Sequence, residues 1–200
     1  MIKLHKFISA ILHPVVIPTI GIFLYFIVTP VRLNSDQKLT ILAIVFMTTY
    51  IVPLLLLVFL KAVGYINSYE VFSIKERKVP LFFMITILFF LAKLFRKLDA
   101  VQDLSYLFYG TVLGLTITYL LFFSKLKSSL HLLSMGSAIG FFVIFQQIHH
   151  TNILPVVIVL ILLSGILGCS RLSLKAHTPK EVYTGFFIGF FSQFMVYYLL

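Results

Sequence analysis

Long apolar runs separated by short polar intervals make up most of this 200-residue chain. A helix needs roughly 20 apolar residues to cross the hydrocarbon core of a bilayer, and seven segments approach that length. They cover approximately residues 7–29, 39–60, 80–95, 104–123, 131–148, 153–169 and 181–200. The third is short and ends in cations that can reach a membrane surface, so six and seven crossings are both consistent with the pattern. The sequence therefore predicts an all-α, polytopic transmembrane helical bundle.

Prolines and paired glycines inside the apolar runs indicate how the helices pack. Pro14 and Pro18 interrupt the first segment directly after His13, and a bundle tolerates such breaks when neighbouring helices satisfy the freed backbone groups. We interpret this segment, His13 included, as a kinked packing helix. Pairs of glycines four residues apart, which predict close helix approach, are Gly110 with Gly114, Gly136 with Gly140, and Gly185 with Gly189. Because no repeat or flexible linker divides the chain, we expect one integral membrane domain over residues 1–200.

The composition supports the membrane interpretation and narrows the partners. Hydrophobic residues make up 60% of the chain and charged residues 11%, with a mean hydropathy of +1.09, which excludes an ordinary soluble domain. The net charge of +10 could suit nucleic acid, but Trp is absent and the cations lie between apolar runs. We therefore expect anionic membrane lipids or a phosphate substrate and no nucleic acid. The single Cys169 excludes an internal disulfide and a Cys-rich metal site, and we expect it to pack against neighbours.

The polar stretch SRLSLKAHTPKEVYTGFFIG, residues 170–189, carries the most specific chemical pattern. Five residues separate Arg171 from His177, and three more separate His177 from Glu181. On a helix or its first turn, His177 and Glu181 share a face, where a carboxylate can fix the tautomer of a nucleophilic imidazole. The planar guanidinium of Arg171 suits a phosphate. The stretch also fits a capping box, with Thr178 as N-cap and Glu181 reaching back, so both interpretations stay open.

Two further polar clusters precede apolar segments. SIKERKVP lies between the second and third segments, and KLKSSLH lies between the fourth and fifth. Their candidate side chains are Lys75, Arg77 and Lys78 in the first cluster, and Lys127, Ser129 and His131 in the second. Two crossings separate each cluster from the next, so all three should emerge on one membrane face. The pair His149 and His150 should lie on the opposite face, where we interpret it as interfacial or capping.

In order and content, the three clusters resemble the signatures of the type-2 phosphatidic acid phosphatase superfamily, over about residues 75–200. The third cluster matches the Arg, His and carboxylate pattern, with Glu181 where the family usually carries Asp. The second matches the Ser and His of a Pro-Ser-Gly-His signature at Ser129 and His131, with Ser and Leu in place of Pro and Gly. The first departs most, because its Arg-Pro pair is broken and its leading Lys is missing.

The resemblance implies a metal-independent lipid phosphatase that needs no cofactor. His177 would attack phosphorus to form a phosphohistidine, Glu181 would hold its tautomer, and His131 would protonate the leaving oxygen and then activate water. The phosphate-binding residues would be Lys75, Arg77, Lys78, Lys127, Ser129 and Arg171. The substrate would be a lipid carrying a phosphate monoester or diphosphate, such as phosphatidic acid, phosphatidylglycerol phosphate, undecaprenyl diphosphate or a lipid A phosphate.

Orientation is implied by the resemblance, because bacterial members mostly act at the outer face of the inner membrane. The site would then face the periplasm. The positive-inside rule does not decide the orientation. Once six possible phosphate contacts are left out, the two membrane faces carry equal numbers of Lys and Arg.

Other functions remain open at this point. A catalytically inactive member could serve as a lipid-binding or scaffold subunit of a membrane complex, which the altered first and second signatures favour. A phosphotransferase would use the same phosphohistidine with another acceptor. A small transporter fits less well, because the intramembrane polar residues are few and uncharged.

Overall fold

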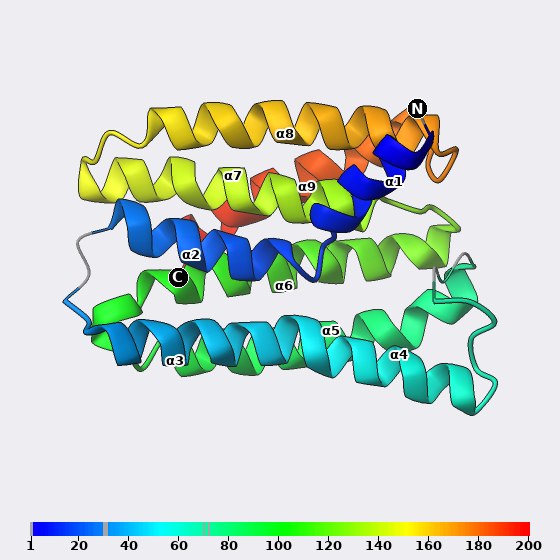
Figure 1. Ribbon diagram of the computed structural model, residues 1–200, viewed down its shortest axis with the longest axis horizontal. Helices are drawn as coiled ribbons and strands as arrows, with labels where there is room; N and C mark the ends of the chain where they lie inside the picture. Colours follow the sequence, from blue (N-terminus) through cyan, green and yellow to red (C-terminus); the bar gives the residue numbers. More distant parts are fainter. Residues whose placement is uncertain (1, 30–31, 70, 72) are drawn as a thin grey trace.

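A computed structural model describes residues 2–29, 32–69, 71 and 73–200, and these residues form an antiparallel bundle of helices (Figure 1). The helices are α1 (Ile2–Ile11), α2 (Ile17–Val28), α3 (Ser35–Phe46), α4 (Val52–Ala62), α5 (Ile74–Phe95), α6 (Asp103–Leu121), α7 (Leu130–His149), α8 (Leu154–Ser173) and α9 (Pro179–Leu199). A π-helical turn at Met47–Ile51 joins α3 to α4, and short 3-10 turns lie at Asp99–Val101 and Phe122–Ser124. The predicted all-α polytopic fold is confirmed.

Within the described residues, six helices are long and apolar enough to cross a membrane. They are the joined helix Ser35–Ala62, α5, α6 with its terminal turn, α7, α8 and α9. The predicted first crossing, 7–29, is instead two shorter helices. A proline lacks the N–H that a helix interior needs, so α1 ends at Ile11 before Pro14, and α2 begins at Ile17 with Pro18 in its first turn. The kinked helix of the sequence analysis is therefore a break between α1 and α2.

The third crossing begins earlier than its hydropathy indicated. A capping box starts α5, in which the hydroxyl of Ser73 accepts from the amide of Glu76 at 3.2 Å and the carboxylate of Glu76 accepts from the amide of Ser73 at 3.3 Å. The helix therefore includes the first polar cluster, with Pro80 inside it. The segment predicted as short, 80–95, is a full-length span of 22 residues.

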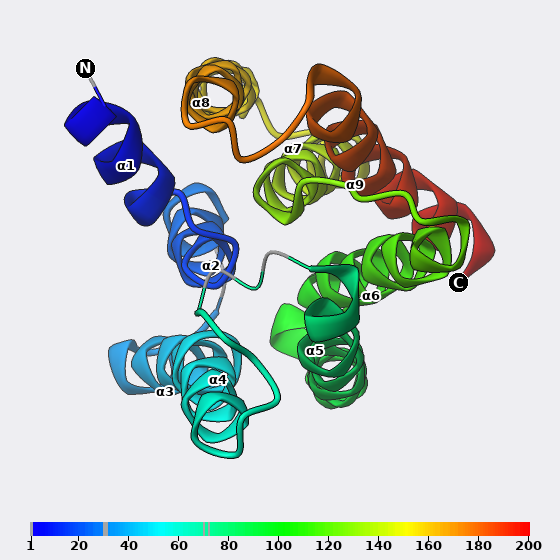
Figure 2. The ribbon, with the colours of Figure 1, turned by 90° about the vertical axis from the view of Figure 1, so that its right-hand side faces the viewer.

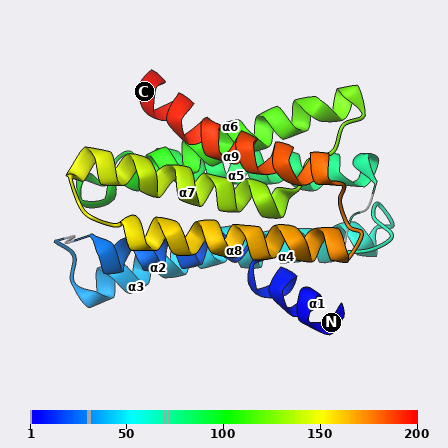
Figure 3. The ribbon, with the colours of Figure 1, turned by 90° about the horizontal axis from the view of Figure 1, so that it is seen from above.

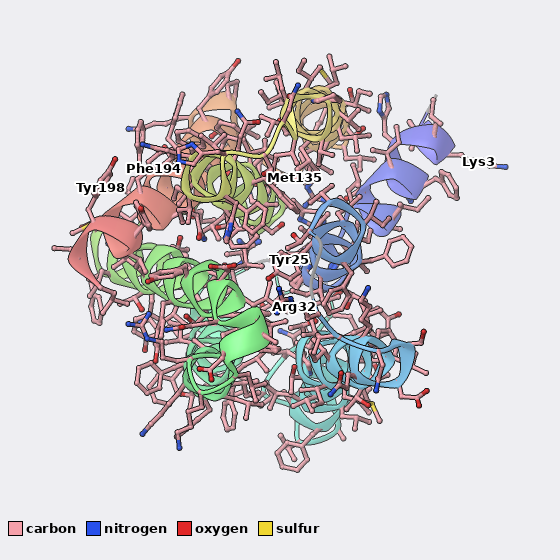
Figure 4. All side chains as sticks on the ribbon, turned by 90° about the vertical axis from the view of Figure 1, so that its left-hand side faces the viewer. Lys3, Tyr25, Arg32, Met135, Phe194 and Tyr198 are labelled. Carbon is pink, nitrogen blue, oxygen red and sulfur yellow. The ribbon has the colours of Figure 1, made fainter. Side chains whose placement is uncertain are left out.

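Helix α7 forms the centre of the bundle, surrounded by α2, α6, α8 and α9 (Figure 2). It packs on α9 through paired glycines, because Gly136 faces the backbone of Phe186 and Gly189 faces the carbonyl of Leu133. A side chain at either glycine would collide with that backbone, so the predicted close approach is confirmed for these two helices. Apolar side chains pack between the other helices, where Tyr25 of α2 is only 1% exposed (Figure 4).

The surface of the spans is apolar, as a lipid-facing surface requires. Phe90, Leu162 and Phe191 are all more than half exposed. Cys169, which we expected to pack, is also exposed on α8. Helix α1 leaves the long axis of the bundle and packs against α8 near the end that carries the N-terminus (Figure 3).

Candidate functional site

The three polar clusters meet at one end of the bundle. The start of α5, the connection between α6 and α7 and the connection between α8 and α9 all lie there, beside α1 (Figures 1 and 2). The opposite end carries His149, whose Nε2 lies 3.0 Å from a carboxylate oxygen of Asp103. His149 is therefore remote from the clusters, as its position in the chain indicated.

Two cavities open among the cluster residues. The first, which we call the inner cavity, has polar lining that includes His13, Arg77, His131, Arg171 and His177. The second, the outer cavity, has polar lining that includes Arg77, Lys127, Lys175, His177 and Glu181. Because Arg77 and His177 line both, the two cavities meet at this pair.

His177 and Glu181 form a close pair at the start of α9. The Nδ1 atom of His177 lies 2.8 Å from Oε2 of Glu181, and the side chain of His177 is only 3% exposed. Because the carboxylate can only accept, Nδ1 carries the proton and Nε2 carries the lone pair. The same Oε2 accepts from the amide of Thr178 at 3.2 Å, and the hydroxyl of Thr178 accepts from the amide of Glu181 at 3.3 Å. Glu181 is thus both the cap of α9 and the partner of His177.

The surroundings of His177 favour its neutral form. Burial lowers the pKa of His177 below its ordinary value, the hydrogen bond with Glu181 opposes that shift, and the nearby guanidinium groups of Arg171 and Arg77 add to it. A neutral imidazole has the lone pair that a nucleophile needs. Burial therefore favours the uncharged ring, while Glu181 offers a carboxylate to any positive charge that develops on it.

Helix α1 connects the second and third clusters through Ser9. Arg171, in the last turn of α8, donates from Nη1 to the hydroxyl of Ser9 at 2.7 Å. The Nε2 atom of His131 lies 3.2 Å from the carbonyl oxygen of Ser9 and 3.4 Å from its hydroxyl. A carbonyl accepts only, so Nε2 of His131 donates and its Nδ1 is left to exchange a proton.

His13 is a site residue that the sequence analysis did not assign. Its ring contacts that of His131 edge to face, with centroids 4.9 Å apart, and it lines the inner cavity. The amide of Val15 donates to Nδ1 of His13 at 3.4 Å. The only signal in the sequence was its position before Pro14, where the chain turns between two helices; nothing in the sequence marked Ser9.

The predicted phosphate ligands separate into two groups. Arg77 is the cation of the first cluster that the described cavity linings include, and its Nε donates to the carbonyl of Val71 at 2.7 Å. Lys75 is exposed, and Nζ of Lys78 lies 5.1 Å from the ring centre of Phe123. Both lysines lie outside the described linings.

Ser129, predicted as a phosphate ligand, also lies outside the described linings. It is fully buried, and its amide donates to the carbonyl of Glu181 at 3.0 Å. Its backbone packs against Gly185 of α9, where a side chain would collide. Ser129 therefore fixes the start of α7 against the start of α9.

Together, the site combines a carboxylate-bound imidazole, a second imidazole and several cations around connected cavities. Such a set can bind a phosphate dianion through charge-assisted hydrogen bonds and attack it with the Nε2 lone pair of His177. Comparison of this chain with protein-family models, with curated proteins and with solved structures finds no match.

Proposed function

We propose that this chain is an integral membrane lipid phosphatase that removes a phosphate monoester or diphosphate from a lipid headgroup through a phosphohistidine. The observation that carries the proposal is the 2.8 Å contact between His177 and Glu181 at the junction of two cavities lined by Arg77. A helix cap alone would require Glu181 but not a buried imidazole beside it. The resemblance of the three clusters to the type-2 phosphatidic acid phosphatases gives the same reaction.

In the first step, the Nε2 lone pair of His177 attacks phosphorus in line with the leaving oxygen. The P–N bond forms as the P–O bond to the lipid breaks, and the imidazolium that develops is stabilised by Glu181. The guanidinium groups of Arg77 and Arg171 and the ammonium of Lys127 offset the charge on the non-bridging oxygens. The departing lipid oxygen takes a proton from His131.

In the second step, water replaces the imidazole on phosphorus. His131, now neutral, accepts a proton from the water as its oxygen forms a bond to phosphorus. The P–N bond breaks, its electron pair returns to Nε2 of His177, and inorganic phosphate leaves. The site lies at the ends of the spans, so the lipid headgroup can enter it while the lipid remains in the membrane. We place this end in the periplasm of a bacterial inner membrane, in line with the resemblance.

The test is phosphate release from a panel of lipid phosphates by the purified protein, with and without a chelator. We expect release that the chelator does not change, and a loss of about 10³-fold or more in His177→Ala, as for removal of a hydrolase nucleophile. His149→Ala is the matched control, because His149 also has a carboxylate partner but lies at the other end. Unchanged release by His177→Ala would refute the mechanism. Lipid phosphate binding without release from any substrate would favour the lipid-binding subunit instead.

A further inference from the structure

A third cavity lies beside the inner cavity, within the bundle. This apolar cavity lies between α2, α5, α6 and α7 and has a volume of about 120 Å³. It shares five lining residues with the inner cavity, namely Pro14, Val15, Leu81, Met84 and Leu130. The two cavities are therefore neighbours with a common wall at the break between α1 and α2.

The apolar cavity reaches deep along α7. Its lining extends from Leu130, at the start of the helix, to Phe142. At 1.5 Å of rise per residue, these positions are about 18 Å apart along the axis, which is more than half of a hydrocarbon core of roughly 30 Å. A ligand that filled this length would have to be long and narrow.

The hydroxyls in the wall of the apolar cavity already have backbone acceptors. Thr111, Ser134 and Ser137 each donate to a carbonyl of a helix, at 2.8, 2.9 and 3.4 Å respectively. The remaining lining is aliphatic, aromatic or glycine. A cavity of this kind stays dry and accepts apolar groups, so its chemistry selects a hydrocarbon and not a second headgroup.

We propose that the apolar cavity holds one long hydrocarbon chain of the lipid phosphate whose headgroup occupies the inner cavity. This inference rests on the proposed function for the position of the headgroup. The substrate would then be a lipid phosphate with a long alkyl or isoprenoid chain. One such chain would leave the bilayer and enter the protein. Transfer from the bilayer brings little hydrophobic gain, because lipid tails are as apolar as the wall. The gain comes from filling a void, which for this volume is on the order of a hundredfold in affinity.

Gly21 offers a way to block the apolar cavity without disturbing the packed wall. It is buried in α2 and lines the cavity, and a Cβ placed there meets no atom within 4 Å. Gly165 in α8 has the same freedom but is exposed. The substitutions Gly21→Leu and Gly165→Leu are therefore matched, and only the first fills the cavity.

The experiment uses a single-chain alkyl phosphate with a diazirine at the chain terminus, bound to the full-length protein in nanodiscs. We expect photolabels on the cavity wall, Phe141 and Phe142 in particular, in the native protein and in Gly165→Leu. In Gly21→Leu these labels should fall about tenfold or more. Labels confined to lipid-facing residues such as Phe90, or equal labelling of the two variants, would overturn the inference. The positions of the photolabels on the native protein test the inference even if Gly21→Leu does not fold.

Phosphate release by the same variants separates this inference from the proposed function. We expect Gly21→Leu to lower kcat/KM for a long-chain lipid phosphate by about tenfold or more and to spare butyl phosphate, because a short chain does not need the cavity. If the apolar cavity is labelled but the native protein releases no phosphate, the hydrocarbon-chain site is supported and the phosphatase proposal is refuted. If instead the apolar cavity is not labelled and Gly21→Leu releases phosphate from long-chain lipid phosphates at the native rate, the phosphatase proposal stands. The proposed hydrocarbon-chain site is then refuted.

Discussion

Replacing Glu181 by Gln separates its two structural roles. The carboxylate atom Oε2 accepts hydrogen bonds from both Nδ1 of His177 and the amide of Thr178. In the variant, the amide oxygen of Gln can take the place of Oε2 and keep both bonds, since Gln also serves in a capping box. The substitution therefore retains the cap and the tautomer of His177 but removes the negative charge beside the ring.

The expected loss follows from that charge. At an effective dielectric constant of about 20, a carboxylate about 4–5 Å from the centre of an imidazolium stabilises it by about 3–4 kcal/mol. The amide dipole of Gln retains part of this, so we expect the barrier to rise by about 3 kcal/mol, or roughly 10²-fold in rate. The cap itself is kept, so the unfolding temperature should change little.

The assay compares phosphate release and thermal unfolding of the purified variant in detergent. The matched control is Glu76→Gln, because Glu76 closes the capping box of α5 with Ser73 and is hydrogen bonded there to Asn67 and not to a histidine. We expect Glu76→Gln to keep the native rate. If Glu181→Gln releases phosphate within threefold of the native rate, the charge is dispensable and Glu181 serves only as a cap.

Two further predictions concern pH and helix packing. Because burial lowers the pKa of His177, the acid limb of kcat/KM should lie below the ordinary pKa of 6.5, and Glu181→Gln should move it lower still, since the negative charge of Glu181 raises this pKa. In this window the unfolded state binds more protons, so stability from this group is present above 6.5 and lost as the pH falls towards the folded-state pKa; a limb above 6.5 would contradict the dominant effect of burial on His177. Gly189→Ala should cost about 1–3 kcal/mol of stability, because the added methyl collides with the carbonyl of Leu133, whereas Gly165→Ala meets open space; thermal unfolding that ranks them otherwise would contradict the α7–α9 packing.

Hydropathy predicted the crossings wherever a segment was apolar throughout, and it was wrong at two helix starts. The first segment contains enough apolar residues for a span, but Pro14 and Pro18 divide it into α1 and α2. The third seemed short because its first turns are charged, although Ser73 and Glu76 already formed a capping-box pattern that predicts a helix from Ile74. Local hydrogen-bond chemistry, not average hydropathy, decided where these helices begin and end.

The candidate site was predictable where its contacts are local. His177 and Glu181 are four residues apart, on either side of the N-cap Thr178, so their contact follows from the local geometry at the start of α9. The contacts of Ser9 with His131 and Arg171 join residues more than 120 positions apart, and they depend on how α1 packs against α8. No periodicity in the sequence encodes that packing, because the break at Pro14 allows α1 to take many directions.

Helix phase decides which cation of the first cluster can serve the site. Successive residues on an α-helix are about 100° apart, so Lys75, Arg77 and Lys78 project in different directions once α5 includes them. Arg77 projects to the cavities and Lys78 to Phe123. If the stretch were a loop, the three cations would be equivalent candidates, whereas in a helix Arg77 is the one that lines the described cavities.

The start of α9 uses the same residues for the helix cap and for the candidate site. Gly185 lets the backbone of Ser129 approach α9, and the amide of Ser129 then donates to the carbonyl of Glu181. The side chain of Glu181 meanwhile closes the cap and holds His177. His131 lies two residues after Ser129, so the same contact fixes the second imidazole relative to the first. The backbone of Ser129 thus helps to position the two histidines, although its side chain lies outside the described cavity linings.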